Sequence, residues 1–364
     1  MRILASKPAL RWLAPAVVVG AVATTLVAAS AQADKSLPPI SAEQLLVDLQ
    51  QSKIDGLSGT VIQEADLGIP AIPGAGGEDN SELTSLISGT HTLRIRYAAP
   101  DKARLAVFSN LGETDTITNG KDVWTWSSKG QKATHRTLGE HADKANRSAP
   151  ADAPQTPQEA AQKFLSSITP STTVSTDASV TVAGREAYEL VLDPNDDAAK
   201  VKQVRIAVDN VTRQPLRVQV FAANKQLVLG VGYKQVSFTR PDDAEFEFNA
   251  PPGTTVTEAP KVEHKAPSAK DRDAIEKKAA AAKEQTKIVG TGWTSVVVRK
   301  LDGADPTAAN GQLGAFLDRL PEVSGTWGKG RLLTGTAFSA VVTDDGRIAV
   351  GSVEPDLLYA ALSK

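Results

Sequence analysis

Apolar and polar residues alternate along most of the chain between residues 57 and 258, with the two-residue period of β-strands. The stretches 89–97 (GTHTLRIRY) and 202–208 (KQVRIAV) show the pattern best. Glycine, asparagine and aspartate separate such strands at short intervals, as in antiparallel meanders. Because one face of these strands is apolar and the other polar, the sequence predicts an open antiparallel sheet with one covered face and one wet face.

Two helices interrupt the strands. Ser41 is followed three residues later by Gln44, which is the spacing of a capping box, and Gly56 marks the expected end of this first helix. A second helix is expected over 157–168, where Pro157 takes the first helical position. A twisted antiparallel sheet covered by two helices can curl into a half-barrel. The predicted fold class is therefore α+β: a curved antiparallel sheet, or unclosed β-barrel, covered by helices.

The segment 66–80 (DLGIPAIPGAGGEDN) is too rich in glycine and proline to form regular structure, yet it carries apolar residues that need cover. Two interpretations remain open. The segment is either a lid over an apolar opening or an ordinary surface loop with a few buried side chains. The residues assigned to the lid are Leu67, Ile69 and Ile72.

Composition changes sharply after the last expected strand, within 246–258. Residues 259–287 are rich in alanine, lysine and charge with almost no apolar stripe, which indicates a charged linker, expected to be helical. The alternative is a solvated surface helix of one large domain. From residue 288 the pattern predicts a small α+β module that contains a hairpin turning on Asp345-Gly346. The predicted domains are thus a sheet domain over 34–258 and a C-terminal module over 288–364.

The first 33 residues have the form of a signal peptide. Basic residues precede an apolar run over 12–30, and Ala31-Gln32-Ala33 offers a small-residue cleavage site. The rival interpretation is an uncleaved membrane anchor, because the run is nearly long enough to span a bilayer. Both predict that the remainder of the chain is extracytoplasmic, either secreted or at the cell envelope.

The search for catalytic chemistry finds no motif. The chain has no cysteine, and its four histidines lack metal-ligand spacing. There is no GxSxG nucleophile elbow and no phosphate-binding loop. A formal net charge of −2 argues against an electrostatically driven nucleic-acid partner. The sequence therefore predicts no catalytic residues, no metal, no cofactor and no nucleic acid.

Trp124 and Trp126 are two residues apart and share one strand face, while Val123, Thr125 and Ser127 share the other, more polar face. The indole face is therefore predicted to point inward, toward a ligand cavity. The alternative is a plain core packed against the helix at 157–168. The residues predicted to line the cavity are Leu93, Ile95, Tyr97, Trp124, Trp126, Val204, Ile206 and Val208.

Residues 92–108 (TLRIRYAAPDKARLAVF) and 118–133 (TNGKDVWTWSSKGQKA) resemble the strand and turn order of the LolA-like lipoprotein-carrier superfamily. The similarity covers about 40–258, and the tail 336–362 resembles the C-terminal module of RseB/MucB regulators. The resemblance implies a half-barrel that holds an acyl chain without covalent catalysis. It also implies a cavity arginine that latches the lid, for which Arg94, Arg96 and Arg104 are the candidates.

Three classes of function follow. The leading hypothesis is an exported, non-enzymatic protein that binds lipid or the acyl chains of a lipoprotein, as a carrier or a sensor. The second is an envelope-stress regulator of the RseB/MucB type, in which the C-terminal module binds a membrane anti-sigma factor. The third, an envelope hydrolase, would need a cluster of titratable residues with perturbed pKa values in a cleft.

Overall fold

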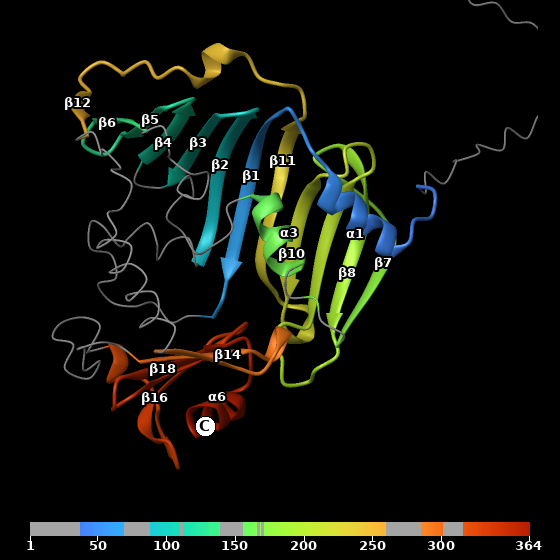
Figure 1. The fold of residues 1–364 in the computed structure, drawn as a ribbon, viewed down its shortest axis with the longest axis vertical. Helices are drawn as coiled ribbons and strands as arrows, with labels where there is room; N and C mark the ends of the chain where they lie inside the picture. Colours follow the sequence, from blue (N-terminus) through green and yellow to red (C-terminus); the bar gives the residue numbers. More distant parts are fainter. Residues whose placement is uncertain are drawn as a thin grey trace, which may run out of the picture. The chain divides into compact units, whose positions relative to one another are not determined.

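A computed structural model describes residues 37–68, 88–109, 112–138, 156–165, 168, 171–259, 285–300 and 316–364. The leader, the lid positions Ile69 and Ile72 and most of the predicted linker lie outside these residues. Strands dominate the described chain, and they form two sheets of twelve and six strands (Figure 1). Within the described residues, every helix is too short or too polar to cross a bilayer.

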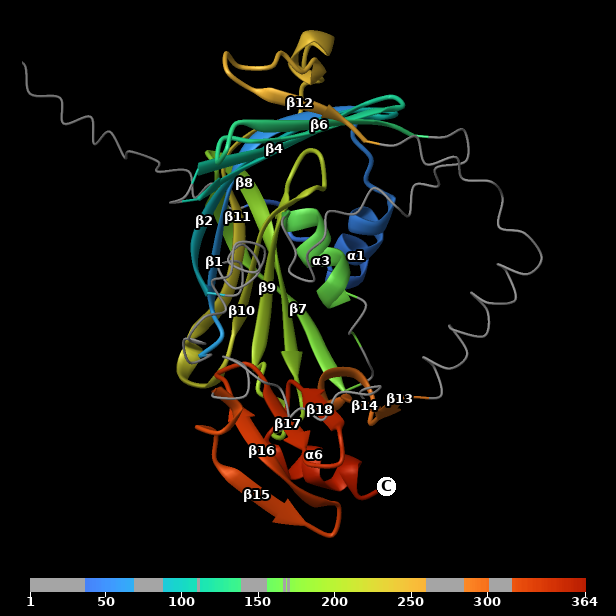
Figure 2. The ribbon, with the colours of Figure 1, turned by 90° about the vertical axis from the view of Figure 1, so that its left-hand side faces the viewer.

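The larger sheet runs in the order β12-β6-β5-β4-β3-β2-β1-β11-β10-β9-β8-β7. Every neighbouring pair is antiparallel except β12 and β6, which are parallel. The sheet is open because β12 and β7 stand at its two ends, and it curves toward the side that holds α1 and α3 (Figure 2). This confirms the predicted curved antiparallel sheet covered by helices. The strands are β1 (Gly56–Asp66), β2 (Ser88–Ala98), β3 (Lys102–Ser109), β4 (Gly112–Asn119), β5 (Asp122–Ser127), β6 (Lys132–Thr137), β7 (Thr172–Val182), β8 (Arg185–Pro194), β9 (Gln203–Asp209), β10 (Pro215–Phe221), β11 (Leu227–Ser237) and β12 (Thr255–Glu258).

Helix α1 (Ala42–Gln51) begins at the predicted cap, where the Ser41 hydroxyl accepts a hydrogen bond from the Gln44 backbone N–H at 3.2 Å. It ends before Gly56 because Ser52 is already extended. Gly56 instead opens β1, where a Cβ atom would clash with the Cα atom of Arg240. The prediction that Gly56 ends the helix was therefore wrong, and a glycine is needed at this position because of the close approach of Arg240.

Helix α3 (Pro157–Leu165) begins as predicted, since the Thr156 hydroxyl accepts from the Glu159 backbone N–H at 3.1 Å. It packs on β10 and β11, whereas α1 packs on β7. The two helices bury Leu45 and Ala160 completely against the sheet. Removing apolar surface from water in this way is the main force that holds helices on a sheet.

The smaller sheet runs in the order β13-β14-β18-β17-β16-β15 and is covered by α6 (Pro355–Leu362). Its hairpin joins β17 and β18 and turns at Gly346, whose φ of 82° favours glycine, as predicted. Phe316, Leu317 and Leu320 form a small buried cluster beside it. The strands are β13 (Thr286–Val289), β14 (Val296–Lys300), β15 (Glu322–Gly325), β16 (Gly328–Thr334), β17 (Ser339–Thr343) and β18 (Arg347–Gly351).

Hydrogen bonds connect residues of the two sheets. The backbone N–H of Lys200 donates to the carbonyl of Ser352 at 2.8 Å, and its ammonium donates to the carbonyl of Gly335 at 3.1 Å. The Trp293 indole donates to the Thr172 hydroxyl at 2.8 Å. Lys200 is buried, and its ammonium is satisfied by the bond to Gly335 and by an ion pair with Glu354 at 3.7 Å, since an unpaired charge would be costly to hide from water. The boundaries 34–258 and 288–364 stay predictions.

Candidate binding site

The two faces of the larger sheet differ in chemistry, and the register assigns each residue to a face because directly opposed residues share one. Val61 opposes Leu93 on β2 and Tyr233 on β11. Ile206 opposes Leu190 on β8 and Val218 on β10. All six belong to the main hydrophobic core, which contains α1 and α3 as well. We call this side the apolar face.

Five of the predicted cavity residues are buried together in this core: Leu93, Ile95, Val204, Ile206 and Val208. Tyr97 is half-buried against them, and so is Leu67, the one predicted lid residue within the described chain. The structure therefore brings together six of the eight predicted residues and the first residue of the predicted lid. Whether they contact a ligand stays a prediction.

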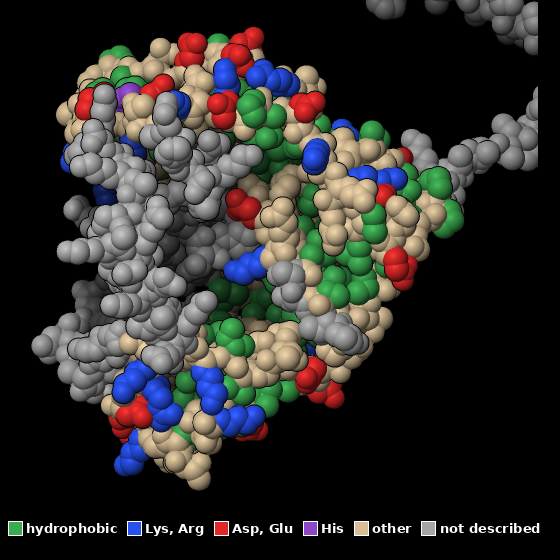
Figure 3. Space-filling model, in the orientation of Figure 1, with side chains coloured by type: hydrophobic (Ala, Val, Ile, Leu, Met, Phe, Trp, Pro, Cys, Tyr) green, Lys and Arg blue, Asp and Glu red, His purple; other side chains and the backbone are tan. Residues whose placement is uncertain are grey.

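On the apolar face, the side chains over β8 to β10 are more deeply buried than those over β3. Val204, Ile206 and Val208 are fully buried, whereas Leu105 and Val107 on β3 are only half-buried against the same core. Sequence reasoning missed these two residues, although the alternation in KARLAVFS (102–109) places them on one face. In Figure 3, hydrophobic side chains gather in the hollow at the centre of the described surface.

The same face turns polar toward the sheet's end. On β4 and β5 it presents Thr116 and Thr125, which oppose each other and are both exposed. Thr116 also opposes Leu105 on β3, so the change from apolar to hydroxyl side chains occurs between two neighbouring strands. An apolar ligand would thus find its most accessible contact at Tyr97, Leu105 and Val107, with a polar margin beside it.

The prediction that Trp124 and Trp126 point into the apolar cavity was wrong. Trp124 on β5 opposes Ile117 on β4, and Ile117 in turn opposes Arg104 on β3. Arg104 opposes Arg96 on β2. These four residues form one row across the sheet, on the side opposite Leu93 and Ile95. We call this side the charged face. Sequence alternation shows only that two residues share a face. Which face that is depends on pairings with β4, β3 and β2.

Trp124 is instead covered by the segment 238–254, which connects β11 to β12 and which we call the crossing segment. The Trp124 ring stacks on Phe248 of that segment with centroids 4.7 Å apart, and on His135 of β6 at 4.3 Å. Phe246, in the short 3₁₀-helix η3 (Asp243–Phe246), is buried against Ile117 in the same small cluster. The alternative of a core packed against the helix at 157–168 is therefore also wrong.

None of the three candidate latch arginines lies on the apolar face. Arg94, Arg96 and Arg104 alternate with Leu93, Ile95 and Leu105, so all three extend from the charged face. Arg104 pairs with the buried carboxylate of Asp115 at 2.6 Å, and Arg96 pairs with Glu245 of the crossing segment at 3.1 Å. These three arginines therefore do not lie on the face where the ligand is predicted to bind.

Ion pairs hold the charged face together at several places. On β8 the buried carboxylate of Glu189 accepts from Arg205 at 2.6 Å and from Arg217 at 3.2 Å. At the end of β9, Arg185 donates two hydrogen bonds to Asp209 at 2.6 and 2.9 Å. Burial alone would raise the pKa of Asp209, but Arg185 and Thr212 outweigh it and hold that pKa below its ordinary value.

His135 is the described histidine with the clearest electrostatic setting. Its two ring nitrogens lie 2.9 Å from Glu258 and 3.0 Å from Asp122, while its ring stacks on Trp124. Burial lowers its pKa, but the two carboxylates outweigh burial and raise the pKa above the ordinary value. This trio joins β5, β6 and β12. No cluster of histidines and carboxylates within the described chain could hold a metal ion.

Comparison with known proteins gives remote structural similarity alone. No protein-family model and no curated protein matches the chain by sequence. The chain is similar to the Pseudomonas aeruginosa MucA/MucB complex structure, with 14% identity, a TM-score of 0.43 and coverage of 88% of this chain and 96% of that one. It is also similar to a LolA superfamily protein from Nitrosomonas europaea, with 10% identity, a TM-score of 0.23 and coverage of 58% and 99%. Similarity at this level carries no argument about function.

Proposed function

We propose that this chain is an exported, non-enzymatic binding protein that holds an acyl chain of a lipid or lipoprotein against the apolar face of its larger sheet. The observation that carries the proposal is the half-buried apolar strip at Tyr97, Leu105 and Val107, which continues a core that α1 and α3 leave partly uncovered. A protein of this kind needs shape and apolar surface but no reacting group. The extracytoplasmic location rests on the predicted leader.

The energetics favour a carrier or a sensor over a permanent store. Burying one CH₂ group is worth about 0.8 kcal/mol, so a chain of about 16 carbons gains on the order of 12 kcal/mol relative to water. A bilayer offers a similar gain. Transfer from the membrane to the protein is therefore nearly neutral, which permits both uptake and release.

The test is native mass spectrometry of the full chain purified from its own host, compared with two variants. Leu105→Asn places an amide on the apolar strip, whereas Ile62→Asn places one at a half-buried position on the charged face of β1. We expect the wild type and Ile62→Asn to carry a lipid mass and Leu105→Asn to lose it. Equal loading of all three proteins, or no lipid on any of them, would reject acyl binding at this strip.

A second candidate function, a regulator that binds a membrane anti-sigma factor or a lipoprotein, is favoured by one contact. The backbone N–H of Thr336, which follows β16 of the smaller sheet, donates to the carbonyl of Leu67, the first of the predicted lid residues, at 2.8 Å. A ligand that shifts Leu67 would thus disturb the C-terminal module directly. Affinity capture from host membranes separates the two functions: one dominant membrane protein supports the regulator, and lipid alone supports the carrier.

A further inference from the structure

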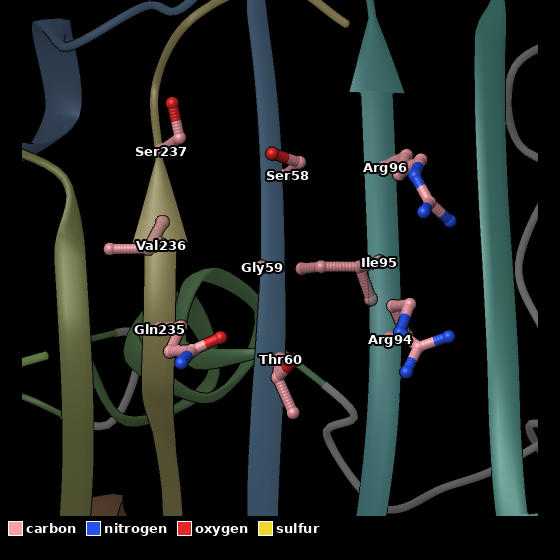
Figure 4. Close-up of a pocket in the computed structure, with 9 residues that line it drawn as sticks. All are labelled: Ser58, Gly59, Thr60, Arg94, Ile95, Arg96, Gln235, Val236 and Ser237. Carbon is pink, nitrogen blue, oxygen red and sulfur yellow. The ribbon is translucent and has the colours of Figure 1, made fainter. Parts of the chain in front are cut away.

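A second candidate site lies on the charged face, away from the apolar strip. Side chains of three neighbouring strands, β11, β1 and β2, form a shallow, open hollow of about 320 Å³ (Figure 4). The register places Ser58 beside Arg96 and Ser237, and Thr60 beside Arg94 and Gln235. Serine, threonine, glutamine and arginine residues contribute to its lining, and none of the lining residues is acidic. The guanidinium groups of Arg94 and Arg96 extend from β2 on the side away from β1 (Figure 4). We call this hollow the Arg94 groove.

The two arginines of the groove differ in what they contact. The Nε atom of Arg96 lies 3.1 Å from a carboxylate oxygen of Glu245. Arg94 is exposed, and its guanidinium lies over the Phe108 ring, 5.1 Å from the centroid, without an ion pair to any other described residue. An arginine remains charged at all ordinary pH values and presents a planar fork that matches a carboxylate. Among the described residues, no carboxylate pairs with the guanidinium of Arg94.

Glu113 is an acidic residue on the same face that interacts electrostatically with Arg94. Glu113 on β4 opposes Phe108, so it extends from the charged face as well. Burial raises the pKa of Glu113 above its ordinary value, Asp115 adds to this effect, and the attraction of Arg94 offsets it only in part. No ion pair joins Glu113 to Arg94 among the described residues, so an incoming carboxylate could pair with Arg94 without displacing one.

The chain itself shows how this face binds an acidic segment. In the crossing segment, Asp243 pairs with Lys102 at 3.0 Å and Glu245 pairs with Arg96 at 3.1 Å. One acidic stretch (DDAEFE, 242–247) thereby reaches basic residues on two strands. Arg94 is the next basic residue on the same face of β2, two positions from Arg96. Asp243 and Glu245 pair with Lys102 and Arg96 in turn, and a third carboxylate placed further along the same line would reach Arg94.

We propose that the Arg94 groove binds an extended acidic segment of a partner protein, with Arg94 receiving one of its carboxylates. The hollow is several times larger than one carboxylate, and its hydroxyl and amide groups offer donors and acceptors to the peptide backbone beside that carboxylate. Because Arg94 is exposed, the contact contributes modestly to affinity and mainly selects for charge and weakens with salt. The proposal is independent of acyl binding, since it uses the opposite face.

The probe is a synthetic oligoglutamate peptide, titrated into the full chain at low ionic strength by isothermal calorimetry, with oligoglutamine as the uncharged control. Arg94→Gln removes the charge, and Arg94→Lys keeps it but removes the fork. Lys129→Gln, at an exposed position in the turn after β5, changes net charge equally at a distance. We expect Arg94→Gln to weaken binding roughly fivefold, Arg94→Lys to weaken it less, and Lys129→Gln to leave it nearly unchanged.

Equal weakening by Arg94→Gln and Lys129→Gln would show a response to net charge alone and would overturn the proposal. Absence of oligoglutamate binding to the wild type would do the same. Inorganic phosphate serves as a further arm. Phosphate binding that depends on Arg94 while oligoglutamate fails to bind would identify a small-anion site and reject the peptide assignment.

Discussion

Replacing Trp124 by alanine tests whether the crossing segment is a structural cover. The indole is half-buried and stacks on two rings, those of Phe248 and His135. An aromatic pair contributes about 0.5–1.5 kcal/mol beyond area burial, so the two stacks together contribute about 1–3 kcal/mol. A fully buried tryptophan costs about 3–5 kcal/mol on truncation to alanine. Because Trp124 is partly exposed, we expect a loss of about 2–3 kcal/mol in the free energy of unfolding.

The assay is urea denaturation of the full chain, followed by far-ultraviolet circular dichroism so that loss of an indole does not change the signal. Val123→Ala is the matched control, since Val123 is half-buried on the opposite face of the same strand. A double-mutant cycle with Phe248→Ala should return a coupling of about 0.5–1.5 kcal/mol. The crossing segment should also become more sensitive to protease in Trp124→Ala, because the Phe248 ring loses its partner.

Two results would refute the assignment of Trp124 to the charged face. One is a loss below about 1 kcal/mol with no coupling to Phe248, which would mean that the stacking contributes no stability. The other is a large change in Trp124 fluorescence when fatty acid binds, in a variant that retains this tryptophan alone. An indole on the charged face is separated from an acyl chain by the sheet, so its emission should stay constant.

Three further predictions concern stability. The raised pKa of His135 means that its ion pairs stabilise the fold below the ordinary value of 6.5 and lose this contribution as pH rises through the folded-state pKa. His135→Gln should therefore be more destabilising at acid pH than at pH 9, where only the loss of the stack on Trp124 remains, as measured by urea titration. Asp209→Asn should cost about 3 kcal/mol in the free energy of unfolding at neutral pH, because it leaves the Arg185 fork without a carboxylate, and this difference should shrink in acid as the wild-type Asp209, whose pKa is lowered, becomes protonated. A protein ending at residue 258 should stay soluble and melt cooperatively if 34–258 is a domain, while aggregation on truncation would contradict that boundary.

Local signals in the sequence predicted local structure well. The Ser41 cap, the Pro157 helix start and the Asp345-Gly346 turn each depend on residues a few positions apart, and all three are present in the structure. The apolar stripe of Leu93 and Ile95 was also predicted correctly, because a covered strand must place its apolar side chains against the core.

These local signals could not predict how segments far apart in the sequence pair with one another. Trp124 was assigned to the wrong face because its environment depends on Phe248, more than a hundred residues later, and on the register of four strands. The extent of the final strand was predicted inaccurately for the same reason. A strand was expected within 246–258, but only Thr255–Glu258 pairs, in parallel with β6. No local pattern indicates that an apolar residue will be covered by a distant segment.

The parallel pairing of β12 with β6 has a mechanical consequence. β12 is the last strand of the larger sheet along the chain, so tension applied to the chain beyond residue 259 acts first on this short edge strand. A pull along the strand axis loads the bonds from Thr255 to Gln131 and from Ala259 to His135 together, in shear, and the His135–Glu258 ion pair shares the load. Once β12 slides, the force passes to the crossing segment and its stacked rings. The pairing of β12 with β6 should therefore be the first part of the larger sheet to break under such a pull. The force needed to break it should fall when His135 loses its proton, because the ion pair with Glu258 is then lost.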